Sequence, residues 1–179
     1  MFKGSNVALI TPFKNNKLDE ESYIKLIHFH IENGTNGLVP AGTTGESPTL
    51  SHDEHQRVID LCIKESNGKI PVIAGTGSNS TEEAIALTSH AEKAGADGAL
   101  VVTPYYNKPT QEGLYQHYKA INDNTSIPII IYNIPSRCVI DMSVDTMARL
   151  FELKNITGVK DATGDLNRLN ETLKKLGPE

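Results

Sequence analysis

Residues 72–102, VIAGTGSNSTEEAIALTSHAEKAGADGALVV, carry the signals of one complete strand–helix–strand unit. Its two continuous apolar runs, Val72–Ala74 and Ala99–Val102, are typical of parallel strands that are buried on both faces. Between them, Ser80-x-x-Glu83 is a capping box that predicts the start of a helix, and Gly95 predicts its end. This stretch therefore predicts two parallel strands joined by a helix.

The same unit repeats along the whole chain. Apolar runs begin at residues 7, 38, 72, 99, 129 and 156, so their starts are 31, 34, 27, 30 and 27 residues apart. A period of about 30 residues is that of a βαβ repeat. The six predicted strands are Val7–Ile10, Leu38-Val39, Val72–Ala74, Ala99–Val102, Ile129–Tyr132 and Ile156–Val159.

Helix boundaries are marked between these runs. A second capping box, Ser51-x-x-Glu54, predicts a helix start, and further N-cap residues are Asp19, Thr110 and Ser143. Helix ends are predicted at Asn33-Gly34 and Asn67-Gly68. The last helix is amphipathic and stops at Gly177-Pro178; its apolar stripe is Leu166, Leu169, Leu173 and Leu176.

Six strand–helix units fit two α/β folds, an open doubly wound sheet and part of a (β/α)8 barrel. The dinucleotide-binding doubly wound fold requires Gly-x-Gly-x-x-Gly, and residues 75–80 lack the third glycine. No lysine-containing phosphate loop is present either. Regular spacing, with polar clusters after nearly every strand, favours the barrel. We therefore predict one α/β domain over residues 1–179, a (β/α)8 barrel of the TIM type with about six of its units.

Composition excludes several functional classes. The 179 residues include 17 Lys+Arg and 22 Asp+Glu, and a net charge of −5 does not favour nucleic acid or an anionic membrane as a partner. No apolar stretch approaches the ~18 residues of a membrane span. Two cysteines, Cys62 and Cys138, are too few for a disulfide framework or a zinc site. The sequence thus predicts a cytoplasmic protein without a bound metal.

Polar residues gather after four of the predicted strands, where parallel α/β folds build their sites. After the second strand, Gly42-Thr-Thr-Gly45-Glu46 offers free backbone N–H groups and two hydroxyls, which suit a bound carboxylate. A plain glycine-rich turn is the alternative. After the fourth strand, Tyr105 and Tyr106 lie on a proline-flanked loop, where a phenol could relay a proton, anchor a subunit contact or simply pack beneath the loop.

The fifth and sixth strands end in the most informative residues. Tyr132 ends an aliphatic strand, and Arg137 follows it, where a guanidinium could hold a carboxylate with two hydrogen bonds. Lys160 lies in a strand expected to be buried, and burial lowers the pKa of an amine, as a Schiff-base nucleophile requires. A lysine that extends to water from the strand end is the alternative. Together the four clusters indicate a carbonyl substrate that bears a carboxylate.

These clusters closely resemble the dihydrodipicolinate synthase family. The resemblance runs from Met1 to about Leu176, and the segments that carry it are Gly42–Glu46, Thr103–Asn107, Tyr132–Arg137 and Gly158–Thr163, with Phe2–Pro12 and Ile70–Gly77. It implies a TIM-barrel, Schiff-base-forming lyase that condenses pyruvate with L-aspartate 4-semialdehyde in lysine and diaminopimelate biosynthesis. It also implies a homotetramer built as a dimer of dimers, with no metal or organic cofactor.

The resemblance assigns roles to the residues that match family motifs. It implies that Lys160 forms the pyruvate imine and that Tyr132 donates and accepts protons beside it. Thr43 would connect Tyr132 to Tyr106, which reaches in from a neighbouring subunit.

The same motifs imply the substrate contacts. Thr44, in the turn bounded by Gly42 and Gly45, would hold the carboxylate of pyruvate, and Arg137 would receive the carboxylate of the semialdehyde. Arg137 and the tyrosine pair favour the synthase over N-acetylneuraminate lyase and keto-deoxy sugar-acid aldolases, which share the barrel and the lysine and stay as alternatives.

The resemblance also implies a possible allosteric lysine site at a subunit interface. The residues that match it are Ser47, His52, His55, Asn79, Glu83 and Tyr105. A solvent-facing helix surface is the alternative explanation for the two histidines.

The length of the chain conflicts with a closed barrel. Eight units require roughly 250 residues, and the two last strands and a C-terminal helical region are not found after Leu176. A third hypothesis is therefore an inactive, truncated remnant of the synthase.

Overall fold

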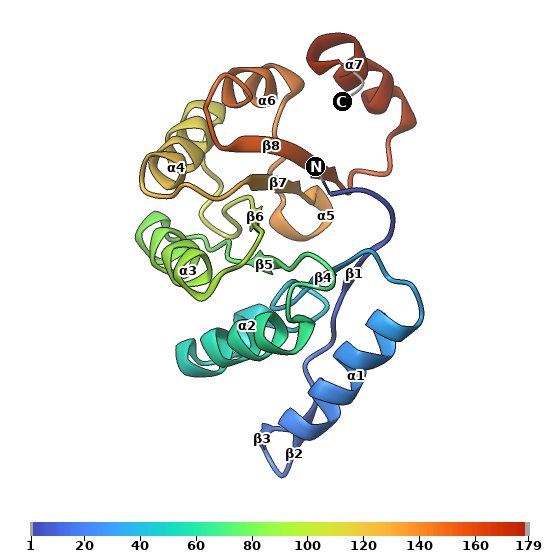
Figure 1. Cartoon of the computed structure of the whole chain (residues 1–179). Helices are drawn as coiled ribbons and strands as arrows, with labels where there is room; N and C mark the ends of the chain where they lie inside the picture. Colours follow the sequence, from blue (N-terminus) through green and yellow to red (C-terminus); the bar gives the residue numbers. More distant parts are fainter. Residues whose placement is uncertain (1, 178–179) are drawn as a thin grey trace. The chain divides into compact units, whose positions relative to one another are not determined.

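The structure is a computed structural model that describes residues 2–177; Met1, Pro178 and Glu179, and with them the proline of the predicted helix stop, lie outside the described residues. Three short strands precede α1, and from β4 to α7 each strand is followed by one or two helices (Figure 1). Two compact units are formed. Unit 1 comprises Met1–Thr76 and Leu87–Leu100, and unit 2 comprises Gly77–Ala86 and Val101–Glu179.

The strands are short and the helices longer. The strands are β1 Asn6–Ala8, β2 Phe13–Lys14, β3 Lys17–Leu18, β4 Gly37–Val39, β5 Ile73–Gly75, β6 Gly98–Val102, β7 Ile129–Asn133 and β8 Ile156–Asp161. The helices are α1 Glu20–Glu32, the 3-10 helix η1 Ser47–Thr49, α2 His52–Ser66, α3 Thr81–Ala94, α4 Gln111–Asp123, α5 Pro135–Cys138, α6 Val144–Leu150 and α7 Leu166–Leu176.

Unit 1 is a parallel arrangement of strands with α1 and α2 packed against it. β1 pairs in parallel with β4, and β5 pairs in parallel with the first residues of β6. Its core buries residues of both helices, including Tyr23 and Ile27 of α1 and Val58, Ile59 and Cys62 of α2. The parallel pairing confirms the prediction made from unbroken apolar runs.

Unit 2 contains the last residues of β6 together with β7 and β8. β6 ends here, the Thr103 N–H that follows it donates to the Tyr132 carbonyl (3.0 Å), and β7 pairs in parallel with β8. The resulting strand order is β5-β6-β7-β8. The β7–β8 ladder shifts once, because Ile129 pairs with Ile156 while Ile130 pairs with Gly158. Thr157 is therefore the extra residue of a β-bulge.

Two strand predictions were wrong. The first strand ends at Ala8 rather than Ile10, and a short β2–β3 hairpin follows that the apolar pattern did not indicate. Asn15 and Asn16 form its turn with φ of 52° and 58°, the left-handed conformation that two-residue hairpins require and that asparagine tolerates.

The sixth predicted strand is not buried throughout. Only Ile156 of β8 is fully buried, and Lys160 is exposed at the residue level. The reason is the sheet order: β8 stands last and pairs with β7 alone.

Helix starts follow the predicted capping residues. Asp19, Ser51, Thr110 and Ser143 each accept a hydrogen bond from a backbone N–H of the first turn, and Ser51 and Glu54 form the full capping box. The last helix, α7, also has its predicted bounds. It buries no residue, and Leu166, Leu169 and Leu173 of its apolar stripe are 79%, 54% and 42% exposed.

Gly75 gives the first test of this packing. A Cβ at Gly75 would lie 2.3 Å from the Ala41 carbonyl oxygen and 2.9 Å from the Gly42 nitrogen, both backbone atoms. We expect Gly75→Ala to lower the free energy of unfolding by about 1–3 kcal/mol or more, since backbone cannot move aside cheaply. Urea unfolding measures this. Gly158→Ala is the control, because its Cβ would meet Ile130 at an ordinary 3.7 Å; equal losses in both variants would contradict the steric argument.

His117 gives a pH-dependent test. It is 5% exposed, its Nδ1 lies 2.8 Å from Thr81 Oγ1, and burial lowers its pKa from 6.5 to about 4. The unfolded chain therefore binds this proton more readily, so stability contributed by neutral His117 is present above pH 6.5 and is lost as the pH falls toward 4.

We expect the free energy of unfolding to fall by up to about 3 kcal/mol across this window. The His117→Gln variant should show a flatter dependence. Urea titrations at several pH values measure both slopes, and an unchanged slope in the variant would contradict the assignment to His117.

Candidate active site

Lys160 and Tyr132 form the centre of the candidate site in unit 2. The ladder pairs Tyr132 of β7 directly with Lys160 of β8, so both side chains leave the sheet on the same face. Lys160 Nζ lies 4.2 Å from the centroid of the Tyr132 ring. Tyr132 is 7% exposed, and partial burial of the amine lowers the pKa of Lys160 below its usual value. The prediction of a lowered lysine pKa next to a strand-end tyrosine is consistent with this geometry.

The residues that follow this pair lie on the opposite face of the two strands. Asn133 pairs with Asp161, and Asn133 Nδ2 donates to Asp161 Oδ2 at 3.4 Å. Burial favours protonated Asp161, but hydrogen bonds from Thr163 and Asn133 and the charge of Arg168 outweigh it, so the pKa of Asp161 is lowered. Sequence reasoning missed this second layer, although the two-residue alternation of strands would have indicated Asn133 and Asp161.

Arg137 lies on α5, the single helical turn that begins after Ile134. Its N–H donates to the Ile134 carbonyl (3.1 Å), and its side chain is exposed. An exposed guanidinium close in sequence to Tyr132 is free of the desolvation penalty that a buried one carries. The position is compatible with the predicted contact to an incoming carboxylate.

The loop after β6 presents Tyr106 to solvent. Tyr106 has φ of 70° and is 87% exposed. The Asn107 N–H donates to the Tyr105 carbonyl (2.8 Å), and the Asn107 side chain exchanges two hydrogen bonds with Asn79 (3.0 and 3.1 Å). The loop is therefore held in a backbone conformation that residues other than glycine rarely adopt. In this conformation the Tyr106 side chain is directed outward.

The threonine turn belongs to unit 1. It is closed by hydrogen bonds from Gly45 N–H to the Gly42 carbonyl (3.0 Å) and from Glu46 N–H to the Thr43 carbonyl (3.1 Å). Thr11 Oγ1 donates to the Gly45 carbonyl (2.7 Å) and fixes the turn from behind. Thr43 and Thr44 are both exposed. This turn lies in unit 1, and the Lys160–Tyr132 pair lies in unit 2.

The six residues of the possible allosteric site are also divided. Ser47, His52 and His55 lie in unit 1, and Asn79, Glu83 and Tyr105 lie in unit 2. His55 is only 3% exposed, so the interpretation of the two histidines as one solvent-facing surface was wrong. In unit 2, Glu83 accepts a hydrogen bond from Ser78 Oγ, while Asn79 holds the Tyr106 loop through Asn107.

Within residues 2–177, no group of three or more His, Cys, Asp and Glu side chains is arranged to hold a metal ion. Among the helices in this described part of the chain, none combines the length and apolar character that a membrane crossing requires.

Known proteins resemble the chain over its whole length. The model of the dihydrodipicolinate synthetase family matches residues 1–179. A 4-hydroxy-tetrahydrodipicolinate synthase of Pelagibacter ubique (strain HTCC1062) is 84% identical over 179 residues, which are 100% of this chain and 61% of the relative.

Solved structures of dihydrodipicolinate synthases are similar to the chain as well. The dihydrodipicolinate synthase from Aquifex aeolicus superimposes with a TM-score of 0.97 at 55% identity, covering 99% of this chain and 61% of that one. The chloride-inhibited enzyme from Acinetobacter baumannii, complexed with pyruvate, has a TM-score of 0.96 at 54% identity, covering 99% and 62%. The chain thus spans about three fifths of the length of these relatives.

These similarities confirm the predicted fold class, with alternating β/α units of the TIM-barrel type that make up part of the relatives' barrel. The predicted family is confirmed as well: this chain belongs to the dihydrodipicolinate synthetase family.

Proposed function

We propose that this chain carries the Schiff-base chemistry of a 4-hydroxy-tetrahydrodipicolinate synthase, which condenses pyruvate with L-aspartate 4-semialdehyde. The observation that carries the proposal is the position of Lys160 Nζ, 4.2 Å from the ring centroid of the phenol Tyr132. Burial lowers the pKa of Lys160, which increases the neutral, nucleophilic fraction of the amine.

The reaction follows from this pair. The neutral amine of Lys160 adds to the ketone carbon of pyruvate, and loss of the carbonyl oxygen as water leaves an imine. Loss of a proton from the methyl carbon gives an enamine, which attacks the aldehyde carbon of the semialdehyde. The aldehyde oxygen takes up a proton to become a hydroxyl, and water or the amino group of the semialdehyde then displaces Lys160 from the imine. Tyr132 donates and accepts the protons, because its hydroxyl belongs to the residue paired with Lys160.

The remaining residues complete the proposal. Thr44, between Gly42 and Gly45, holds the pyruvate carboxylate, and Thr43 continues the proton path. Arg137 receives the semialdehyde carboxylate; its exposure supports a role at the entrance.

We include self-association in the proposal. Tyr106 is 87% exposed in a strained backbone conformation with φ of 70°, which favours a role at a second copy of the chain over packing within its own. We place the protein in the cytoplasm, a location consistent with its two free, buried cysteines, Cys62 and Cys138.

The proposal is tested by trapping the imine. Incubation with pyruvate and cyanoborohydride should add one pyruvate-derived group to the peptide that contains Lys160, as read by mass spectrometry. Because burial lowers the pKa of Lys160 and so increases its neutral fraction, we expect trapping at Lys160 to exceed trapping at the exposed Lys154.

The controls separate chemistry from folding. Lys160→Arg should abolish the adduct, and Lys154→Arg should leave it unchanged. A folded wild-type chain that forms no adduct at Lys160 would overturn the proposed function. Turnover of the semialdehyde, compared with that of N-acetylneuraminate, then distinguishes the synthase from the related lyases.

We further propose that lysine inhibits the reaction through a site that includes Glu83 and Asn79. Both belong to unit 2, and a carboxylate at residue 83 provides the charge that an ammonium group requires.

We expect millimolar lysine to reduce turnover and Glu83→Ala to abolish this inhibition, because the variant loses that charge. Glu82→Ala, the neighbouring acidic residue of α3, is the matched control. Undiminished inhibition of the Glu83→Ala protein would remove Glu83 from the site.

A further inference from the structure

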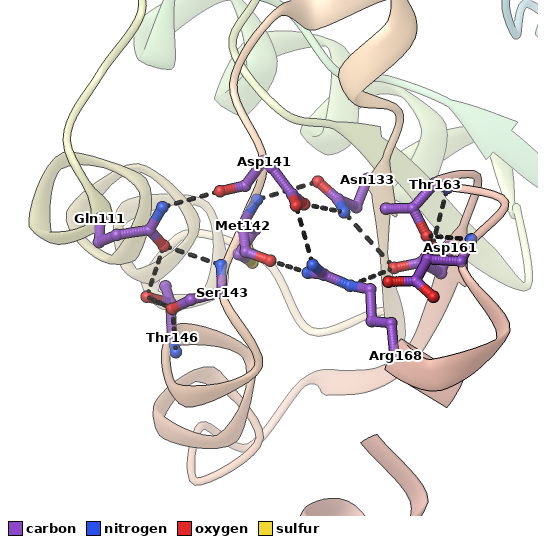
Figure 2. Close-up of polar contacts among 10 residues, drawn as sticks. Gln111, Asn133, Asp141, Met142, Ser143, Thr146, Asp161, Thr163 and Arg168 are labelled. Carbon is purple, nitrogen blue, oxygen red and sulfur yellow. Dashed lines mark hydrogen bonds and ion pairs between the residues drawn. The ribbon is translucent and has the colours of Figure 1, made fainter. Parts of the chain in front are cut away.

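Arg168 connects α7 to the ends of the reacting strands. Its Nε donates to Asp161 Oδ2 (3.0 Å), its Nη1 donates to Asp141 Oδ2 (2.9 Å) and its Nη2 donates to the Met142 carbonyl. Figure 2 shows the guanidinium between the two aspartates. The Arg168 side chain is only 13% exposed, although α7 buries no residue as a whole. The helix is therefore attached through this side chain more than through its leucine stripe.

Arg168 contacts the face of β7 and β8 that is opposite to Tyr132 and Lys160. Asp161 follows Lys160, and its ladder partner Asn133 follows Tyr132. Asn133 Nδ2 donates to Asp141 Oδ1 (2.8 Å) as well as to Asp161 Oδ2 (3.4 Å), and Asn133 Oδ1 accepts from the Met142 N–H (3.1 Å). Every polar atom of the Asn133 side chain is thus used to join the two strand ends to the segment 141–142.

That segment is fixed from its other side by Gln111, the first residue of α4 (Figure 2). Gln111 Nε2 donates to the Asp141 carbonyl (2.8 Å), and Gln111 Oε1 accepts from the Ser143 N–H (3.0 Å) and from Thr146 Oγ1 (2.7 Å). Gln111 therefore holds the backbone of Asp141, while the Asp141 carboxylate is held by Asn133 and Arg168. The network transmits the position of Arg168 to Asn133 and Asp161.

Arg168 also balances charge at this position. Asp141 and Asp161 share hydrogen bonds from one amide, Asn133 Nδ2, so they lie close to one another. The guanidinium is the cation that forms ion pairs with both. Without it, two carboxylates would repel each other one residue away from Lys160, and their negative charge would favour the protonated amine.

We propose that Arg168 is a positioning residue for Schiff-base formation. It holds Asn133 and Asp161 on the rear face of β7 and β8, and so keeps Lys160 Nζ against the Tyr132 ring while the neighbouring carboxylates of Asp141 and Asp161 stay paired with the guanidinium. This inference rests on the proposed function of Lys160, and the experiment below separates the two.

The test compares wild type with Arg168→Gln, Arg168→Lys and Arg149→Gln. Arg149→Gln is the matched control, because Arg149 also pairs with a carboxylate in unit 2, Glu112 (2.9 Å), and lies over a tyrosine ring, Tyr115 (4.1 Å). Two quantities are measured across pH: the rate of pyruvate trapping at Lys160, and the reactivity of Lys160 toward acetic anhydride relative to Lys154. The second does not require pyruvate.

In Arg168→Gln we expect trapping to slow by about tenfold or more. This is the size of effect seen when a residue that orients a reacting group from behind is removed. Both pH profiles should also move to higher pH, because the amine is more readily protonated. Arg168→Lys keeps the positive charge but loses the planar set of N–H donors that binds both aspartates. The midpoint of its pH profiles should therefore stay near that of wild type, while its trapping rate falls. Arg149→Gln should match wild type in both.

Each outcome is decisive. If wild type reacts with acetic anhydride at low pH but never with pyruvate, the proposed function fails, and the shift in Arg168→Gln still tests this inference. If both profiles of Arg168→Gln overlay those of wild type while its melting temperature is unchanged, Arg168 has no positioning role. If Arg168→Gln does not fold, Arg168→Lys decides: a wild-type trapping rate in that variant would overturn the proposal.

Discussion

The parallel pairing of β7 with β8 is the constraint on which the candidate site depends. In a strand, successive side chains point to opposite faces, so the pairing of Tyr132 with Lys160 also fixes the pairing of Asn133 with Asp161. The front face receives the reacting amine and the phenol. The rear face receives an amide and a carboxylate, which are bound to Asp141 and Arg168. One register therefore produces both the reactive layer and the layer that supports it.

Two effects act on the Lys160 amine in opposite directions. The negative face of the Tyr132 ring favours the charged form, but a cation–π contact at a partly exposed site contributes only about 0.5–1 kcal/mol, which is less than one pKa unit. Partial burial favours the neutral form and lowers the pKa. The rear network supports this balance because its guanidinium is paired with carboxylates that would otherwise attract the ammonium.

Local signals in the sequence predicted most of the strands, the helix starts and two residues of the candidate site. Apolar runs gave the parallel strands, and Asp19, Ser51, Thr110 and Ser143 gave the helix starts, because capping depends on residues within one turn. Lys160 and Tyr132 were identified by their position at strand ends. Arg168 was not, since it lies 27 residues from Asp141 and no local pattern records which distant groups a side chain meets. The exposure of β8 depends on the order of strands in the sheet and not on its own residues alone.

The bulge at Thr157 decides which face of the sheet carries the Lys160 amine. If the pairing of Ile129 with Ile156 continued without it, Tyr132 would be opposite Val159 and Lys160 opposite Asn133. A strand that kept Thr157 but paired it regularly would be equally apolar and would keep every motif, yet it would place the amine behind the sheet, away from the phenol. The irregular pairing at Thr157, and not the presence of the lysine alone, therefore decides on which face of the sheet the amine meets the phenol.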